Sequence, residues 1–230
     1  MKLSQLLPDL TQADIEIQGL TLDSRQVKAG DLFLACAGRQ HDGRRYIEQA
    51  VAAGAVAVAY EPDGFSAPAL AVPMLAVSGL RQQLSALADR FYGQPSAALQ
   101  VVGITGTNGK TSVSQMLAQA LNQLGSRCGV IGTLGSGFPE ALVDHGMTTP
   151  DALAVQRQLA GLLAEGARQV AMEVSSHALD QQRVAAVRFA VGVFTNLSQL
   201  QSFIYVNKES LVSRPTSFGA ILYICLIPPE

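Results

Sequence analysis

Residues 101–112 read Val-Val-Gly-Ile-Thr-Gly-Thr-Asn-Gly-Lys-Thr-Ser, and this stretch decides the fold. A short apolar run ends in a glycine-rich loop, and the loop opens a segment with helical periodicity. Glycines let backbone N–H groups converge on an anion, and the start of the following helix adds partial positive charge at the same place. The stretch therefore predicts a phosphate-binding loop between a buried strand and a helix.

The side chains of this loop have separate expected roles toward ATP. Lys110 would neutralise the β- and γ-phosphates, and the Thr111 hydroxyl would be a ligand of Mg²⁺, which assists phosphoryl transfer. The usual pattern G-x-x-x-x-G-K-[ST] requires glycine at position 104, where this sequence has Ile104, with Gly103 one place earlier. Three spaced glycines followed by Lys-Thr argue against a turn without a ligand. The expected ATP-binding residues are Gly106, Thr107, Asn108, Gly109, Lys110, Thr111 and Ser112.

Strands and helices alternate along the rest of the chain. Apolar runs at 130–131, 170–174 and 190–194 predict strands, and Pro150 is expected at the first position of a helix. We therefore expect an α/β protein with a parallel sheet covered on both faces, in which ligands bind at the carboxyl ends of the strands. The helix after the loop should bury one apolar face, made of Val113, Met116, Leu117, Ala120, Leu121 and Leu124.

The sequence before the loop predicts a smaller α/β unit. Residues 44–53 form a predicted helix and 55–60 a buried strand, and a strand at 74–77 precedes an amphipathic helix. Pro95 disfavours helix at the residue before it, so a domain boundary is expected near Ser96. The predicted organisation is a small N-terminal domain at 1–96, a partial phosphate-loop domain at 97–198 and an aberrant tail at 199–230.

Composition narrows the class of partner. Among 230 residues, 16 basic and 18 acidic side chains nearly cancel, which leaves no broad positive field for nucleic acid or an anionic membrane. The three cysteines lie far apart with no Cys-x-x-Cys pair, which argues against a disulfide framework and a zinc cluster. The separated cysteines suit a reducing cytoplasm, and no apolar run approaches membrane-spanning length, so we expect a cytoplasmic protein. We also expect it to be a monomer.

Several short motifs resemble the Mur ligases, and within that family the MurE type. The loop Thr105-Gly106-Thr107-Asn108-Gly109-Lys110-Thr111 is similar to the family's ATP signature, including the shifted glycine. Folylpolyglutamate synthetases carry a related loop, so the remaining motifs select the MurE type. These motifs are Leu22-Asp23-Ser24-Arg25, Gly30-Asp31-Leu32-Phe33, Asp42-Gly43-Arg44-Arg45-Tyr46, Thr148-Thr149-Pro150, Glu173-Val174-Ser175-Ser176-His177 and Phe194-Thr195-Asn196-Leu197-Ser198.

The resemblance implies an ATP-dependent amide ligase of peptidoglycan precursor synthesis. Such an enzyme adds meso-diaminopimelate to UDP-N-acetylmuramoyl-L-alanyl-D-glutamate through an acyl phosphate. The resemblance also implies that Glu173 binds Mg²⁺ with Thr111, and that Lys110 and Glu173 serve catalysis. The implied contacts to the UDP portion are Leu22, Ser24, Arg39, Gln40 and His41, and those to the muramoyl-dipeptide portion are Thr148, Thr149, Ser175, Gln181 and Arg183.

Some of these residues have competing interpretations. Glu173 ends a predicted buried strand at the edge where the loop emerges, so it is either a metal ligand or an ordinary strand-end acid. Ser175-Ser176-His177 suggests a nucleophile, but triad partners are rarely sequence neighbours, and we favour a substrate-binding turn. Arg44 is either a ligand or a solvated charge, whereas the Arg183 guanidinium can pair bidentately with a substrate carboxylate.

After Ser198 the sequence departs from the family's pattern. The resemblance leads us to expect an Asp-His segment, a carbamylated lysine and an amino-acid-binding domain, and residues 199–230 match none of them. We therefore expect a truncated or frameshifted chain, whose sheet ends at the strand containing Phe194 with an uncovered edge. The alternative functions are a non-catalytic nucleotide- or UDP-sugar-binding fragment and a P-loop kinase or GTPase, against which the shifted glycine counts.

Overall fold

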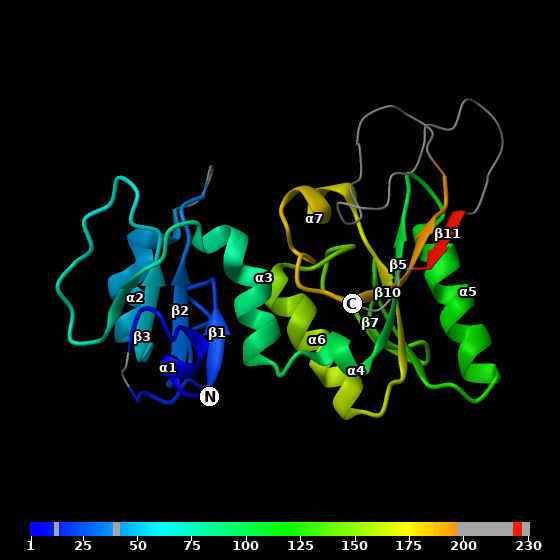
Figure 1. The fold of residues 1–230 in the computed structure, drawn as a ribbon, viewed down its shortest axis with the longest axis horizontal. Coiled ribbons are helices and arrows are strands. Elements are labelled where there is room, and N and C mark those ends of the chain that lie inside the picture. Colours follow the sequence, from blue (N-terminus) through cyan, green and yellow to red (C-terminus); the bar gives the residue numbers. More distant parts are fainter. Residues whose placement is uncertain (12–13, 39–41, 197–222, 227–230) are drawn as a thin grey trace. The chain divides into compact units, whose positions relative to one another are not determined.

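The computed structural model describes residues 1–11, 14–38, 42–196 and 223–226, and the chain divides into two compact units. They are Met1–Phe91 and Tyr92–Glu230 (Figure 1). The division lies slightly before Ser96 because Pro95 opens a short helix, α4 (Pro95–Ala98), and Ser96 Oγ accepts a hydrogen bond from Arg188 N at 3.1 Å. Proline suits this place because the first helical N–H has no intrahelical acceptor.

The first unit contains a four-stranded parallel sheet in the order β1-β2-β3-β4. Its strands are β1 (Gly19–Thr21), β2 (Asp31–Ala35), β3 (Ala57–Tyr60) and β4 (Met74–Ala76), and its helices are α1 (Leu3–Leu6), η1 (Gly43–Tyr46), α2 (Ile47–Ala52) and α3 (Leu80–Phe91). Strand β2 is buried along its whole length, and Phe33 packs with Ile47 of α2 and Val58 of β3. The expected parallel α/β architecture is confirmed here.

The second unit contains a seven-stranded sheet in the order β11-β10-β5-β9-β6-β7-β8. The four strands β10, β5, β9 and β6 are parallel, and the outer strands are antiparallel to their neighbours. In chain order the elements are β5 (Gln100–Thr105), α5 (Lys110–Gln123), β6 (Cys128–Gly132), β7 (Gly135–Phe138), β8 (Ala141–Val143), α6 (Ala152–Ala164), β9 (Gln169–Glu173), α7 (Ser176–Asp180), β10 (Phe189–Phe194) and β11 (Tyr223–Leu226).

Helices cover both faces of this sheet, as the sequence predicted. Ala118 of α5 packs on one face with Ile104 and Ala171, whereas Leu159 of α6 packs on the other with Val170. Neighbouring residues of one strand, such as Val170 and Ala171, point to opposite faces. Figure 1 accordingly shows α5 and α6 on opposite sides of β5 and β10.

The buried face of α5 is narrower than the sequence predicted. Ser114 and Ala118 are its buried positions, and their small side chains let the helix lie close to the sheet. Met116 and Leu124 were expected in the core but are 69% and 82% exposed, and Ala120 is exposed as well. These expectations were wrong because apolar residues occupy more than one side of the helix. The positions Val113, Leu117 and Leu121 do pack against the core.

Two other details differ from the sequence-based expectations. Helix α6 begins after Pro150, because Asp151 is its N-cap and its carboxylate accepts hydrogen bonds from Leu153 N and Ala154 N at 2.9 and 3.0 Å. The edge of β10 is not open, because β11 pairs with it in antiparallel register. The remaining predictions for the tail concern residues outside the described part of the chain.

Among the described helices, none has the length and hydropathy needed to cross a membrane.

Gln156 on α6 provides a test of the packing. The residue is fully buried, and neither its amide oxygen nor its amide nitrogen has a hydrogen-bond partner among the described residues. A buried polar group without a partner costs roughly 1–3 kcal/mol. We predict that Gln156→Met raises the free energy of unfolding by about 1 kcal/mol, measured by urea denaturation. Gln119→Met on the exposed side of α5 is the matched control and should change stability little. An equal effect of the two substitutions on the free energy of unfolding would contradict the prediction.

Candidate functional site

The glycine-rich loop lies between β5 and α5 at the carboxyl edge of the parallel strands. Strand β5 ends at Thr105, and α5 begins after Gly109, the N-cap, which has a φ of 83°. Gly106 has a φ of 132°, and a Cβ atom there would lie 2.9 Å from Asn196 O. Both glycines are therefore required by the backbone. The N–H groups of the first turn of α5 have no intrahelical acceptor, so they are the natural donors to an anion.

The turn after β10 holds the loop from one side. Thr195 Oγ1 donates to Asn108 O at 2.6 Å. The Asn196 side chain accepts from Asn108 N at 3.1 Å and donates to Asn108 O at 3.0 Å, and Asn196 O accepts from Thr107 N at 3.1 Å. Two N–H groups that were expected to face phosphate therefore donate to Asn196 in this structure. Thr195 and Asn196 belong to a motif that resembles the family, but the sequence did not indicate that they bind the loop.

The Lys110 side chain also contacts the loop. Its ammonium group donates to Gly106 O at 2.7 Å and to Thr107 O at 3.2 Å. Carbonyl oxygens orient an ammonium group without neutralising its charge, so the charge remains available to a phosphate group. The loop therefore has a cation and the free N–H groups of α5 at one place.

Glu173 is fully buried beneath the start of α5. Its Oε2 accepts from Thr111 Oγ1 at 2.9 Å and from Thr133 Oγ1 at 3.0 Å, and its Oε1 accepts from Thr133 N at 3.0 Å. Ser114 Oγ lies 3.5 Å from Oε1. The structure thus brings Thr111 and Glu173 together, as a shared ligand role requires, and the role of Glu173 as a metal ligand stays a prediction. Thr133 and Ser114 were not identified from the sequence, because no local pattern marks them.

The donors at Glu173 fit Mg²⁺, which binds one or two protein oxygens together with phosphate and water oxygens. A hydroxyl oxygen and a carboxylate oxygen 2.9 Å apart supply two such hard donors. The described residues include no cluster of three or more His, Cys, Asp or Glu side chains that could hold a metal alone. A magnesium ion at this place would therefore depend on the phosphates of a nucleotide.

The residues predicted to contact the muramoyl-dipeptide form one hydrogen-bonded network beside Glu173. Thr149 is buried, and its hydroxyl donates to Glu173 O at 2.9 Å and accepts from Ser175 N at 3.0 Å. The Arg183 guanidinium donates to Thr149 O at 2.7 Å and to Gln181 Oε1 at 2.7 and 3.0 Å. The Thr148 and Thr133 hydroxyl oxygens are 3.0 Å apart. These predicted residues therefore lie at the same sheet edge as the loop.

The segment from Ser175 to His177 has the geometry of a helix start. Ser175 is the N-cap of α7, and its Oγ accepts from Ala178 N at 3.2 Å. The His177 side chain is exposed. A hydroxyl that caps a helix is held by the backbone, which supports the interpretation as a turn over that as a nucleophile.

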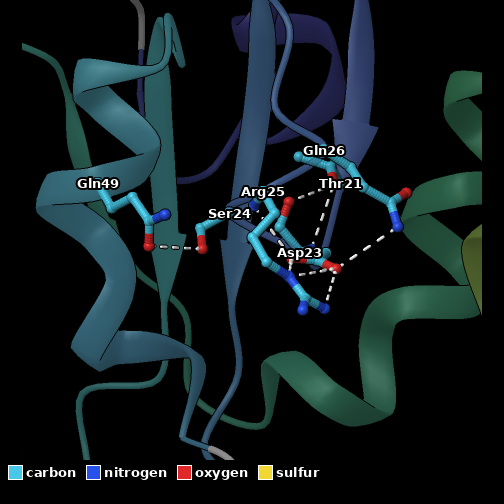
Figure 2. Close-up of polar contacts among 6 residues, drawn as sticks. All are labelled: Thr21, Asp23, Ser24, Arg25, Gln26 and Gln49. Atoms are coloured by element: carbon cyan, nitrogen blue, oxygen red, sulfur yellow. Dashed lines mark hydrogen bonds and ion pairs between the residues drawn. The ribbon is translucent and has the colours of Figure 1, made fainter.

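A cavity of about 700 Å³ lies in the first unit, and its lining includes Leu22, Ser24, Tyr46 and Arg81. Figure 2 shows Ser24 directed toward Gln49 of α2, with Ser24 Oγ donating to Gln49 Oε1 at 3.1 Å. Leu22 and Ser24, both predicted to contact the UDP portion, thus share one cavity. Arg39, Gln40 and His41, predicted for the same role, lie outside the described residues.

Asp23 shapes the turn that carries these two residues. Its carboxylate accepts hydrogen bonds from Arg25 N and from the Arg25 guanidinium, the shortest at 2.7 Å (Figure 2). The hydrogen bonds from the Arg25 side chain hold the pKa of the Asp23 carboxyl below its ordinary value. The motif Leu22-Asp23-Ser24-Arg25 is therefore built around a local ion pair that leaves Leu22 and Ser24 to face the cavity.

Arg44 is not a solvated charge, because its side chain is held by contacts within the protein. Its guanidinium donates to both carboxylate oxygens of Asp42 at 2.9 Å, and to Glu61 O and Asp63 O. It also lies 5.0 Å from the centre of the Phe65 ring, and its side chain is only 12% exposed. The interpretation of Arg44 as a solvated charge was wrong, because Arg44 connects the loop after β3 to Asp42 before η1.

Comparisons with known proteins agree with this arrangement. A family model described as "Mur ligase family, catalytic domain" matches residues 16–92, and one described as "Mur ligase middle domain" matches residues 104–200. The two matched segments correspond closely to the two units of the structure.

Two similar curated proteins share one name. A UDP-N-acetylmuramoyl-L-alanyl-D-glutamate–2,6-diaminopimelate ligase of Pseudomonas aeruginosa is 59% identical over 200 residues, which are 86% of this chain and 41% of that protein. The ligase of the same name from Ectopseudomonas mendocina is 60% identical over 201 residues, with the same coverage. The chain thus spans 41% of the length of these relatives.

Two solved structures share the fold of this chain. A structure of a ligase with that name matches 90% of this chain and 42% of its own, with a TM-score of 0.74 and 31% identity. MurF from Acinetobacter baumannii shares the fold over 83% of this chain and 40% of its own, with a TM-score of 0.58 and 24% identity.

The contacts of Asn196 with the loop can be tested by amide hydrogen exchange. Asn196→Ala removes the side chain that accepts from Asn108 N and donates to Asn108 O. We predict that the Asn108 amide then exchanges at least about fivefold faster, because losing one hydrogen bond of about 1 kcal/mol changes an opening equilibrium by that factor. Asn196→Asp keeps the acceptor and should have a smaller effect. Unchanged exchange at Asn108 in both variants would show that the Asn196 side chain does not hold the loop.

Proposed function

The chain belongs to the Mur ligase family, and we propose that its two units supply the nucleotide site and part of the acceptor site of an ATP-dependent amide ligase. The proposed reaction adds meso-diaminopimelate to UDP-N-acetylmuramoyl-L-alanyl-D-glutamate in peptidoglycan precursor synthesis. One observation carries the proposal: the phosphate loop, the Thr111–Glu173 pair and the Thr149–Arg183 network meet at one edge of the sheet. The names of the similar curated proteins support it.

ATP is the proposed nucleotide. The N–H groups that open α5 would bind phosphate oxygens, and Lys110 would exchange its two carbonyl contacts for contacts with the β- and γ-phosphates. A MurF ligase of Thermotoga maritima, which shares this fold at a TM-score of 0.50 and 20% identity, is described in complex with ADP. Thr111 and Glu173 would hold Mg²⁺, which when bound neutralises charge on the transferred phosphoryl group.

The acceptor is the proposed UDP-linked dipeptide. Its D-glutamate carboxylate would take the terminal phosphoryl group of ATP, which gives an acyl phosphate and ADP. The amino group of diaminopimelate would then form the amide bond and release phosphate. Arg183 would hold a carboxylate near the loop bidentately by exchanging its two contacts with Gln181 Oε1 for it, while Thr149 O keeps the guanidinium in place. Thr148 and Ser175 lie in the same network.

The UDP portion is proposed to occupy the cavity of the first unit. Its volume is in the range of small-molecule sites, and its lining joins apolar residues such as Phe33 and Leu84 to the guanidinium of Arg81, whereas that of Arg25 is paired with Asp23. Apolar walls suit a base, and guanidinium groups suit a diphosphate. We also propose that the protein is cytoplasmic and monomeric.

A binding-only fragment is the alternative function, and the names of the similar curated proteins favour the ligase over it. Phosphoryl transfer needs a complete set of positioned groups, whereas binding needs fewer. Phosphate release from ATP that requires both the UDP-linked dipeptide and diaminopimelate would establish the ligase. Binding of ATP and of the UDP-sugar without such release would establish the fragment.

Lys110 tests the nucleotide site. We predict that Lys110→Met weakens ATP binding by at least about tenfold, because it removes a charge-assisted contact worth roughly 1.5–3 kcal/mol. Titration calorimetry with ATP and Mg²⁺ measures this affinity. Lys28→Met in the first unit is the matched control and should bind as the parent chain does. Equal affinity of the Lys110 and Lys28 variants would refute the nucleotide site proposed here.

Leu22 tests the UDP site independently. We predict that Leu22→Trp, which fills part of the cavity, weakens binding of UDP by about tenfold or more through steric exclusion. ATP affinity should stay unchanged, because Leu22 is not part of the phosphate loop. Leu10→Trp at a 45% exposed position is the matched control. Fluorescence competition with UDP provides the measurement, and UDP affinity that survives Leu22→Trp would place the sugar nucleotide elsewhere.

A further inference from the structure

Thr133 contacts both oxygens of the buried Glu173 carboxylate. Its N–H donates to Oε1 and its hydroxyl donates to Oε2, each at 3.0 Å. The two residues come from different segments, since Glu173 ends β9 and Thr133 follows β6. A two-point contact of this kind fixes both the position and the rotation of the carboxylate plane.

The sheet itself does not require these contacts. Pairing between β6 and β9 ends at Ile131 and Met172, so Thr133 and Glu173 lie beyond the ladder. Thr133 is exposed, whereas Glu173 is fully buried. The intervening Gly132 leaves room for the carboxylate, because a Cβ atom there would lie 2.7 Å from Glu173 Cδ. The backbone after β6 is therefore shaped around the carboxylate.

The same hydroxyl also touches the acceptor side of the site. The oxygens of Thr133 and Thr148 are 3.0 Å apart. A hydroxyl has one proton, and that of Thr133 points to Glu173 Oε2, so the Thr148 hydroxyl is the donor in the second contact. Hydrogen bonds thus run from Thr148 through Thr133 to Glu173, which Thr111 of the phosphate loop also contacts.

We propose that Thr133 is a positioning residue that holds the Glu173 carboxylate ready for the magnesium ion of a bound nucleotide and links it to Thr148. The proposal rests on the nucleotide site proposed above. Partners that orient a metal-binding carboxylate act through the metal, so their loss should appear in metal-dependent binding more than in folding.

The test compares ATP binding by the full chain in the presence of Mg²⁺ and in the presence of EDTA. Thr133→Val keeps the shape and the N–H group but removes the hydroxyl, and it should weaken ATP binding in Mg²⁺ about tenfold. In EDTA the change should stay below about twofold, because no metal then needs the carboxylate. Thr133→Ser restores the hydroxyl and should restore the affinity in Mg²⁺.

Two further variants separate positioning from general structure. Ser126→Ala removes a hydroxyl that donates to Gln169, the residue at the opposite end of β9, and it should bind ATP as the parent chain does in both conditions. Thr148→Val leaves the contact between Thr133 and Glu173 in place, so its loss in Mg²⁺ should be smaller than that of Thr133→Val. Thr133→Ala replaces Thr133→Val if the valine variant does not fold.

Several results would overturn the proposal. They are unchanged or tighter binding by Thr133→Val, an equal loss with Mg²⁺ and with EDTA, no rescue by serine, and a loss in Thr148→Val that matches or exceeds that of Thr133→Val. A parent chain that does not bind ATP in either condition would instead refute the proposed function. The two kinds of failure are thus distinguishable in one set of titrations.

Discussion

The buried carboxylate of Glu173 is the constraint on which the arrangement of the site depends. Removing an ionised carboxylate from water costs several kcal/mol unless hydrogen-bond donors replace the water. Here the donors come from the start of α5, through Thr111, and from the turn after β6, through Thr133. Both segments must therefore lie at the end of β9, which places the phosphate loop and the acceptor network side by side.

Patterns confined to one segment could be predicted from the sequence. The loop from Gly106 to Gly109 was identified because its glycines and the helix after it are neighbours in the chain. Glu173 was placed near the loop because the ends of parallel strands meet at one edge. The contact between Thr111 and Glu173, which that placement requires, is present at 2.9 Å.

Contacts between segments could not be predicted in this way. Thr133 and Asn196 act on residues of other strands, and a single polar residue after a strand carries no periodicity that would mark it. The hairpin of β7 and β8 was missed for a related reason, since Gly135 and Gly137 have φ values of 120° and 140° and lack the side chains that signal a strand. Met116 was misplaced because apolar spacing alone does not show which side of a helix meets the sheet.

The position of Ile104 explains why the loop departs from the usual pattern. Ile104 is fully buried in β5 and pairs with Glu173 on one neighbouring strand and Val193 on the other. The standard pattern has its first glycine at position 104, where this chain has a residue of the strand core. The turn between β5 and α5 is therefore confined to residues 106–109. Because Asn196 takes the N–H groups of Thr107 and Asn108, a loop this short offers few donors of its own. The proposed recognition of phosphate would then depend on the start of α5 and on Lys110, and the neighbouring strands hold that geometry in place.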